Sequence, residues 1–395
     1  MTTRAIIVAA RRTPVGRIGG ALRDLPVEAL AAPVIRAVLA DAGIDPAEVD
    51  DVLLGNAVGP GGNVARLSAL AAGLPVGVPG VTVDRQCGSG LEAINLAARL
   101  VQAGAGEVFL AGGVESTSTA PWRVAKPSSL YRTPAFYDRA RFAPDTVGNP
   151  SMGEAAENVA AAFGIARDRQ DRYALESHRK AVAAQASGRF TREIVPLALP
   201  DGTVVDKDEC PRADTSLDRL ARLRPVFRES GTVTAGNACP VNDGAAVVAV
   251  VSERKFRALG LTRGLAVVDS QAAGVDPKLL GTGPIPAVRK LLARHPGLGV
   301  ADIDFVEFNE AFASQVLASL DALGIDEARV CPSGGALALG HPYGASGAIL
   351  MTRLFSDILF ANDGTPPRRG LATLGIGGGL GLATLVEPVF LEPVR

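Results

Sequence analysis

The chain has 395 residues, 47% of them hydrophobic and 5% aromatic, and its formal net charge is −1. This length exceeds one typical core, so we expect two or three domains or one large duplicated domain. A charge near zero gives no reason to expect nucleic acid or an anionic membrane surface as a partner. The four cysteines lack the spacing of a zinc site or a disulfide framework, and no apolar run is long enough to span a membrane. These features favour a cytoplasmic protein with no nucleic-acid and no membrane partner.

Strand-like and helix-like segments alternate from the start of the chain. Apolar runs at 6–10, 52–54 and 108–111 predict strands, and helical spacing predicts helices over 26–42 and 66–72. Repeated βα units of this kind predict a largely parallel sheet that is covered on both faces. The strand-like run near the N-terminus also leaves no room for a cleavable signal.

The composition changes between about 117 and 237, where prolines, arginines and polar residues increase and strand patterns become fewer. Helical patterns remain at 154–163 and 168–187. His178 lies in a basic helical stretch of this segment, so we expect its side chain to be solvated. We interpret the whole segment as an insertion that carries a surface function.

An internal repeat relates the two ends of the chain. A shift of 254 positions lays residues 27–57 on 281–311 without a gap, and the same shift places Cys87 on His341. Self-similarity at a fixed offset indicates a duplicated architecture. We therefore expect two α/β halves, each with a strand-to-helix elbow, and the two elbows can face one site.

The first elbow is Gln86-Cys87-Gly88-Ser89-Gly90, which lies between a β-branched run and an amphipathic helical pattern. The macrodipole and free N–H groups at a helix N-terminus favour a thiolate over a thiol. Cys87 is therefore a candidate nucleophile. The alternative is a buried structural cysteine in a tight turn, which is the commoner role for a lone cysteine.

The second elbow carries His341 between glycines at the start of another helical pattern. A cysteine paired with a histidine is the usual activated nucleophile, and an amide commonly orients the base. Asn309 ends the strand that precedes His341 in the second half. It is either a group that holds a water or donates to a developing oxyanion, or a helix N-cap. We expect the neighbouring Glu310 to be buried and hydrogen-bonded.

Three blocks of the sequence resemble the signature blocks of the thiolase family. They are Gln86-Cys87-Gly88-Ser89-Gly90, Asn309-Glu310-Ala311-Phe312-Ala313 and Gly340-His341-Pro342-Tyr343-Gly344-Ala345-Ser346-Gly347. Further blocks at 12–16, 234–237, 242–245 and 281–286 match in the correct order, so the resemblance covers nearly the whole chain. It implies a duplicated α/β thiolase fold, five-layered αβαβα, with an inserted loop domain. The expected divisions are an N-terminal half with the nucleophile (1–117 plus 241–262), an inserted CoA-binding loop domain (118–240) and a C-terminal half with the histidine base (263–395).

The resemblance implies acyl transfer between CoA thioesters, as in acetyl-CoA acetyltransferases and 3-ketoacyl-CoA thiolases. Cys87 would take the acyl group as a thioester, with His341 accepting the thiol proton. One oxyanion pocket would use His341 and a water held by Asn309, and a second would use the backbone N–H groups of Cys87 and Gly377. The resemblance also assigns residues to CoA binding, namely Met152, Arg212, Phe227, Cys239 and Phe312. It implies no permanent cofactor, no metal, and a homodimer or homotetramer.

One position departs from the family pattern. Thiolases usually carry a second cysteine in a Cys-x-Gly-Gly-Gly block, where it moves the α-proton of the second CoA thioester, and this chain has Gly375 there. Glycine has no side chain to move a proton, and general acid–base groups contribute about 10²–10⁴-fold in rate. We therefore expect an altered or impaired carbon–carbon step and an intact thioester step on Cys87. The missing side chain is also expected to leave room for a bulkier acyl group.

Several interpretations of this departure stay open. A thiolase-type acyltransferase would need water or another group in place of the missing cysteine. A decarboxylative condensing enzyme, or a plain acyltransferase, would use Cys87, His341 and Asn309 as a Cys-His-Asn triad and would need no base at 375. The chain could instead be a non-catalytic acyl-CoA-binding homologue, or Gly375 could be an engineered change.

Overall fold

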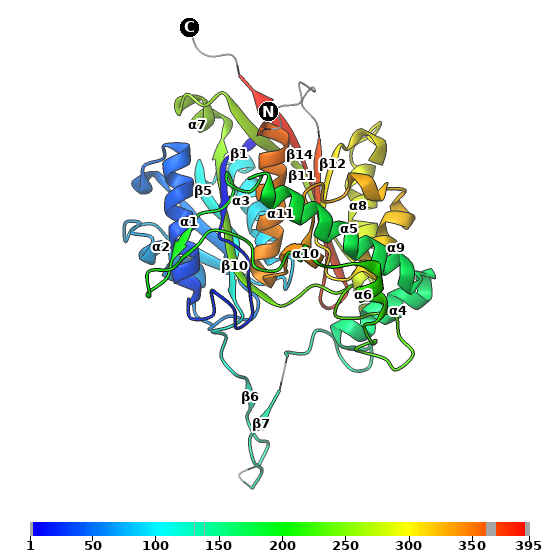
Figure 1. The fold of residues 1–395 in the computed structure, drawn as a ribbon. Helices are drawn as coiled ribbons and strands as arrows, with labels where there is room; N and C mark the ends of the chain where they lie inside the picture. The colour runs from blue at the N-terminus through cyan, green and yellow to red at the C-terminus, as the bar shows by residue number, and fades with distance from the viewer. Residues whose placement is uncertain (1–2, 130, 138, 361–368, 392–395) are drawn as a thin grey trace.

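The computed structural model describes residues 3–129, 131–137, 139–360 and 369–391 (Figure 1). The strands are β1 (Ala5–Arg12), β2 (Gly16–Arg17), β3 (Asp51–Gly55), β4 (Gly80–Val83), β5 (Val108–Ser116), β6 (Val124–Ala125), β7 (Ala135–Phe136), β8 (Leu197–Ala198), β9 (Val204–Val205), β10 (Asn242–Ser252), β11 (Arg263–Gly274), β12 (Phe305–Phe308), β13 (Gly370–Ile376) and β14 (Leu380–Phe390). The α-helices are α1 (Val27–Ala42), α2 (Val64–Ala71), α3 (Ser89–Gln102), α4 (Met152–Phe163), α5 (Arg167–Ala186), α6 (Leu217–Ala221), α7 (Glu253–Ala258), α8 (Pro284–Ala293), α9 (Ala313–Leu323), α10 (Ala336–Leu339) and α11 (Tyr343–Phe360). Short 3₁₀ helices connect several of these elements, among them η2 (Pro277–Thr282).

The strands of both halves join in one sheet, in the order β12-β13-β14-β11-β1-β10-β5-β3-β4. β1 is the junction, because it pairs with β10 along its length and with β11 at Ala5–Ile7. Parallel pairing links β3 with β4 and β5, and β12 with β13, whereas β10, β11 and β14 pair antiparallel with their neighbours. The prediction of a largely parallel sheet is therefore wrong. β14 follows β13 through a tight turn, and β10 follows the insertion, so neither is reached by the crossover helix that parallel neighbours require.

The helices and the two sheet halves form five layers. Side chains of α1 and α2 share a core with the outer face of the N-terminal strands, and α8 and α9 do the same for the C-terminal strands. α3 and α11 lie between the two halves and pack on strands of both, with Leu91, Leu350 and Leu374 in one shared core (Figure 1). The predicted five-layered αβαβα arrangement is confirmed.

The N-termini of the two central helices touch each other at a pair of glycines that the internal repeat relates. A Cβ on Gly90 would lie 2.5 Å from the backbone oxygen of Gly344 and 3.2 Å from the backbone nitrogen of Ala348. Gly344 is equally restricted, because its Cβ would lie 2.8 Å from the Cα atom of Asn56. Residues without a side chain allow backbones to approach this closely. This contact brings the Cys87 elbow and the His341 elbow to one place.

The insertion contains α4, α5 and α6 and two small hairpins. α4 and α5 agree with the helices predicted at 154–163 and 168–187. The β6–β7 hairpin projects away from the rest of the molecule (Figure 1). The expectation of a solvated His178 is wrong, because its side chain is buried and its Nδ1 atom accepts a hydrogen bond from the Arg212 backbone at 3.2 Å. α5 packs on α10 on this side, and burial lowers the pKa of His178 to about 4.

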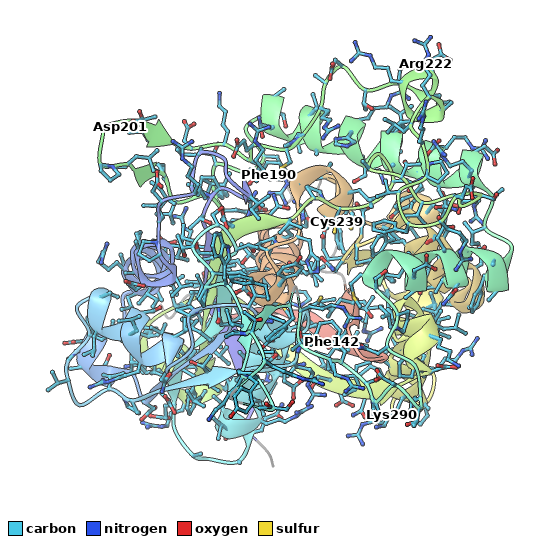
Figure 2. All side chains as sticks on the ribbon, turned by 90° about the horizontal axis from the view of Figure 1, so that it is seen from below. Phe142, Phe190, Asp201, Arg222, Cys239 and Lys290 are labelled. Carbon is cyan, nitrogen blue, oxygen red and sulfur yellow. The ribbon has the colours of Figure 1, made fainter. Side chains whose placement is uncertain are left out.

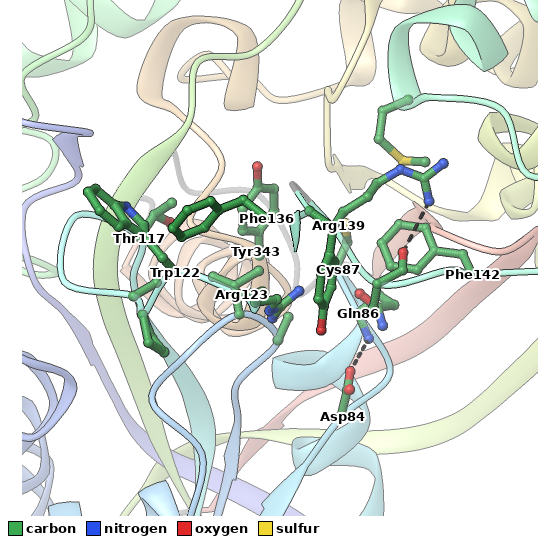
Figure 3. A pocket seen from close by; sticks show the side chains of 17 residues that line it. Asp84, Gln86, Cys87, Thr117, Trp122, Arg123, Phe136, Arg139, Phe142 and Tyr343 are labelled. Atoms are coloured by element: carbon green, nitrogen blue, oxygen red, sulfur yellow. Dashed lines mark hydrogen bonds between the residues drawn. The ribbon is translucent and has the colours of Figure 1, made fainter. Parts of the chain in front are cut away.

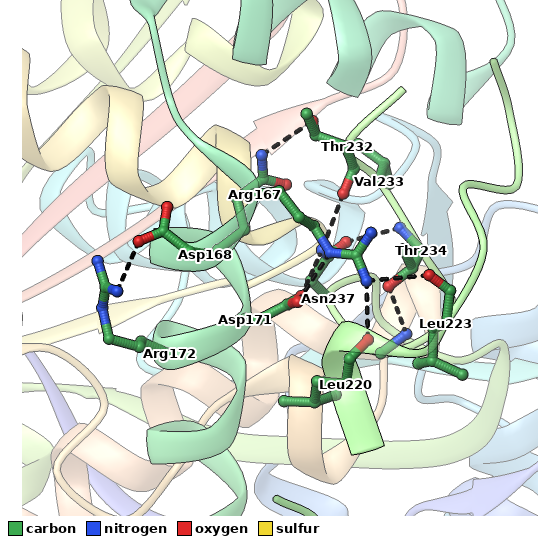
Figure 4. Close-up of polar contacts among 12 residues, drawn as sticks. Arg167, Asp168, Asp171, Arg172, Leu220, Leu223, Thr232, Val233, Thr234 and Asn237 are labelled. Atoms are coloured by element: carbon green, nitrogen blue, oxygen red, sulfur yellow. Dashed lines mark hydrogen bonds and ion pairs between the residues drawn. The ribbon is translucent and has the colours of Figure 1, made fainter. Parts of the chain in front are cut away.

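A polar network holds the end of the insertion against α5 (Figure 4). Asp171 accepts hydrogen bonds from Arg167 Nε at 2.7 Å and from Asn237 Nδ2 at 2.9 Å. The Asn237 side chain also binds the backbone of Thr232 and Thr234, at 3.1 and 2.8 Å. The Asn237 side chain therefore ties the segment that leads to Cys239 to α5.

None of the described helices is long and apolar enough to cross a membrane. The domain limits expected from the sequence (1–117 plus 241–262, 118–240 and 263–395) stay a prediction.

Candidate active site

The Cys87 elbow is a tight turn between β4 and α3. Gln86 adopts a left-handed backbone conformation with φ of 50°, which a non-glycine residue rarely takes. Ser89 closes the turn, because its Oγ atom accepts from the Arg85 backbone at 2.8 Å and donates to the Gln86 oxygen at 2.5 Å. Strain of this kind persists only where the surroundings enforce it, and it is concentrated at functional sites.

The Cys87 thiol is protonated at neutral pH. Burial raises its pKa to about 11, although the backbone N–H groups of Gly377 and of Cys87 itself donate toward the sulfur and act in the opposite direction. The expectation that the helix N-terminus makes this group a thiolate is therefore wrong, because the loss of hydration outweighs the donors. The thiol needs a base that accepts its proton when the sulfur attacks.

His341 is buried and held on three sides. Its backbone N–H donates to Asn242 Oδ1 at 2.8 Å, its Nδ1 atom lies 2.6 Å from Ser346 Oγ, and its ring stacks edge-on with Tyr343 at 5.2 Å between centroids. Burial lowers the pKa of His341 to about 4, so the ring is neutral at pH 7. A neutral ring has one nitrogen without a proton, and Nε2 is that nitrogen when Nδ1 donates to Ser346 Oγ.

Asn309 is hydrogen-bonded to the Nε2 atom of this ring. Its Nδ2 atom is 3.4 Å from His341 Nε2, and its backbone N–H donates to the Thr373 oxygen at 3.1 Å. Asn309 is not a helix N-cap, because α9 starts at Ala313 and its N-cap is Phe312. The prediction for Glu310 is confirmed, since this buried carboxylate accepts from Tyr173 Oη at 3.0 Å and from Ser177 Oγ at 2.6 Å.

Cys87 lies in the wall of a cavity of about 760 Å³ (Figure 3). Aromatic side chains and one methionine form much of its lining, namely Trp122, Phe136, Tyr137, Phe142, Met152 and Tyr343. Within the described residues, the Cys87 sulfur makes no hydrogen bond to His341. The two groups are linked instead through Tyr343, which lines the cavity with Cys87 and contacts the His341 ring.

The residues assigned to CoA binding lie along a path next to this cavity. Arg212, Phe227 and Cys239 line a second cavity of about 400 Å³. Phe312 contacts the Phe227 ring at 6.3 Å between centroids, and Met152 lines the Cys87 cavity. Figure 2 shows Cys239 near the middle of the molecule. The assigned residues are therefore neighbours, although they do not share one cavity.

Two residues that the sequence analysis did not single out support the site. Ser346 lies on the first turn of α11. A serine five positions after the candidate histidine is the feature of the sequence that could have identified it. Glu115 is the second-last residue of the buried strand β5, and it accepts from Asn56 Nδ2 at 2.8 Å, Ala57 N at 2.9 Å and Gly344 N at 3.1 Å. It thus ties the N-terminal half to the start of α11. Burial raises the pKa of Glu115 to about 7.

Two family models match most of the chain. Residues 5–254 match the family model "Thiolase, N-terminal domain", and residues 262–388 match "Thiolase, C-terminal domain". The chain belongs to the thiolase family.

Individual relatives match along nearly their whole length. A protein of Staphylococcus haemolyticus named "Putative acetyl-CoA C-acetyltransferase VraB" is 48% identical over 385 residues, which cover 97% of this chain and 98% of the relative. The protein of the same name from Staphylococcus epidermidis is 47% identical over 384 residues, with the same coverage of 97% and 98%. The crystal structure of the Bacillus anthracis acetyl-CoA acetyltransferase superposes with a TM-score of 0.91 at 39% identity, over 98% of this chain and 99% of that one.

The raised pKa of Cys87 predicts how the free enzyme reacts with iodoacetamide. The alkylation rate of Cys87 should rise about tenfold per pH unit from pH 7 toward pH 11, because only the thiolate reacts. Peptide mass spectrometry measures the rate, with Cys87→Ser identifying the modified peptide. A rate that levels off below pH 8 would contradict the prediction, since it would indicate a thiolate at rest.

Proposed function

We propose that this thiolase-family chain is an acyl-CoA C-acyltransferase, of the acetyl-CoA acetyltransferase or 3-ketoacyl-CoA thiolase kind, that forms an acyl thioester on Cys87. The observation that carries the proposal is the position of the Cys87 sulfur, in a cavity wall with the N–H groups of Gly377 and Cys87 directed toward it. Donors fixed at this point stabilise negative charge on the acyl oxygen without reorganisation.

The proton of the Cys87 thiol goes to His341. The ring is neutral at pH 7 and its Nε2 atom accepts from Asn309 Nδ2, so this nitrogen carries no proton and can take one when the sulfur attacks the acyl carbonyl. Ser346 and Asn242 keep the ring oriented. Once protonated, Nε2 becomes a donor beside Asn309 Nδ2, and together with a bound water the two groups can hold the oxygen of the second substrate.

The carbon–carbon step is altered because Gly375 provides no group to remove the α-proton. Thioester formation uses Cys87, His341 and the Gly377 N–H, none of which depends on position 375. We therefore propose that acylation of Cys87, the first half-reaction, is unimpaired. Removal of the α-proton in the second half-reaction is slow. If no acyl group is transferred at all, the chain is a non-catalytic acyl-CoA-binding homologue.

CoA is held as a substrate by Met152, Arg212, Phe227, Cys239 and Phe312, and the enzyme keeps no permanent cofactor. The contact of Phe227 with both Phe312 and the backbone of Gly153 supports this path. The four cysteines are free, and the cytoplasm keeps thiols reduced, which supports work in that compartment.

The chain also forms a homodimer or a homotetramer in this proposal. The projecting β6–β7 hairpin supports it, because Trp122, Tyr131 and Phe136 are 86%, 98% and 70% exposed in the single chain. Large exposed aromatic side chains gathered on one arm mark an interaction surface.

Intact-protein mass spectrometry tests the acyl transfer. Incubation with acetyl-CoA should add one acetyl group to the wild-type chain and none to Cys87→Ala. His341→Asn should slow the addition by about 10²–10⁴-fold, the range of a general base. An unmodified wild-type chain would contradict the proposal, and so would acetylation that persists in Cys87→Ala.

Light scattering after gel filtration tests the assembly. The wild-type chain should elute as a dimer or a tetramer, and Tyr131→Glu should weaken that assembly because it places a charge on the exposed arm. Val76→Glu is the matched control, since Val76 is 82% exposed and lies outside the hairpin. A wild-type monomer would contradict the proposal.

A further inference from the structure

The room for a larger acyl group lies in the Cys87 cavity and not at position 375. A Cβ on Gly375 would lie 2.7 Å from Gln315 Nε2 and 3.0 Å from the backbone oxygen of Gly281, so the space beside this glycine is already filled. The expectation of extra room there is therefore wrong. The Cys87 cavity, at about 760 Å³, has the size that encloses a drug-sized ligand and is far larger than an acetyl group needs. The side chains that line it indicate which larger acyl group it accepts.

Phe142 separates the Cys87 sulfur from a guanidinium group. The N–H of Gly377 points at the Cys87 sulfur, and a Cβ on Gly377 would lie 2.8 Å from Phe142 Cε2. The guanidinium carbon of Arg139 lies over the same ring, 4.9 Å from its centroid. Phe142 and Arg139 both line the Cys87 cavity (Figure 3). An acyl chain of a few methylene groups that leaves Cys87 along Phe142 therefore reaches Arg139.

Arg139 carries a positive charge that no acidic side chain of the described residues balances. Its Nη1 atom donates to Asn149 Oδ1 at 2.9 Å and to the Ala140 oxygen at 3.3 Å. Its Nη2 atom donates to the backbone oxygens of Asn149 and Pro150, at 2.9 and 2.8 Å. These neutral acceptors fix the position of the group without neutralising it. A fixed guanidinium without a carboxylate partner, on the wall of a cavity, is suited to bind an anionic part of a ligand.

Arg123 places a second guanidinium group on the wall of the same cavity. Its side chain is half-buried and makes no hydrogen bond or ion pair with the residues that the structure describes. Asp84 is the only acidic residue among the described residues of the lining, and its Oδ1 atom accepts from the Gln86 backbone at 2.8 Å. Figure 3 shows Asp84 on the other side of Cys87 from Arg139. The part of the cavity around Arg139 is therefore positively charged.

We propose that the Cys87 cavity takes acyl-CoA thioesters whose acyl chain ends in a carboxylate, and that Arg139 and Arg123 bind this carboxylate. The inference rests on the proposed thioester at Cys87. Because the acyl carbon is bonded to the Cys87 sulfur, an anion that meets these arginines has to be attached to the far end of the acyl chain. The CoA part of the substrate follows a different path in the proposed function, along Arg212 and Cys239.

The covalent step is a thioester exchange. The Cys87 sulfur attacks the acyl carbon, the bond between that carbon and the CoA sulfur breaks, and the thiol proton passes by way of His341 to the CoA sulfur. The products are free CoA and an acyl thioester on Cys87 with a carboxylate at its far end. That carboxylate takes no part in the bond changes. Arg139 and Arg123 are therefore substrate-binding residues that select the end of the acyl chain.

Glutaryl-CoA and pentanoyl-CoA provide the test, because their acyl chains have the same number of carbons and differ in the terminal carboxylate. Intact-protein mass spectrometry measures the rate at which each ester acylates Cys87. In the wild type the glutaryl rate should exceed the pentanoyl rate by about tenfold to a hundredfold, the range of a hydrogen bond to a charged group. Arg139→Met and Arg123→Met should each lower this ratio toward one. Arg139→Lys should restore part of it, because it keeps the charge.

Arg141→Met is the matched control. Arg141 lies in the same segment as Arg139, but it forms an ion pair with Asp145 and does not line the cavity. This variant should keep the wild-type ratio, and thermal melting checks that all variants fold.

Each other outcome overturns a stated part of the account. A wild-type ratio of one or less overturns the inference and leaves the proposed function standing, since acylation by pentanoyl-CoA shows the thioester chemistry. An unchanged ratio in Arg139→Met or Arg123→Met removes that arginine from the site. Equal loss of rate with both esters assigns the arginine to the CoA phosphates or to the loop, and overturns its role with the carboxylate. A chain that neither ester nor acetyl-CoA acylates overturns the proposed function, and this inference with it.

Discussion

The close approach of two helix N-termini is the contact on which the rest of the site depends. Gly90 is the second residue of the helix after Cys87, and Gly344 is the second residue of the helix after His341. A side chain on Gly90 would meet the backbone of Gly344, and a side chain on Gly344 would meet the backbone of Asn56. Glu115 adds a second link, because it binds the backbone of Ala57 on one side and of Gly344 on the other. A nucleophile and a base that are 254 residues apart in sequence are thereby held in one place.

Burial then decides how this pair behaves. It raises the pKa of Cys87 and lowers the pKa of His341, so both groups are neutral at rest. Because the thiol and the imidazole are both neutral, neither group carries a charge until a substrate arrives. The N–H groups of Cys87 and Gly377 are then in place for the charge that develops on the acyl oxygen.

The sequence predicted much of this arrangement, since the repeat and the glycine-bracketed elbows are local patterns. The helices α4 and α5 follow from helical spacing, whereas the five layers were expected from the resemblance to the thiolase family. Three expectations failed for reasons of tertiary structure. The antiparallel position of β10 depends on where the chain returns after the insertion, and the burial of His178 depends on packing between α5 and α10. The protonation of Cys87 depends on desolvation, which a helix N-terminus in the sequence does not reveal.

The residues of the site support thioester formation on Cys87, whereas position 375 provides no group for the carbon–carbon step. The central claim is that Cys87 accepts an acyl group while no side chain at 375 removes an α-proton. Incubation of the chain with acetyl-CoA in D₂O, followed by mass spectrometry of both protein and CoA ester, tests it most directly. The account predicts acetylated Cys87 with no deuterium in the acetyl methyl group, and a gain of deuterium in Gly375→Cys. Deuterium in the methyl group with the wild-type chain would contradict it.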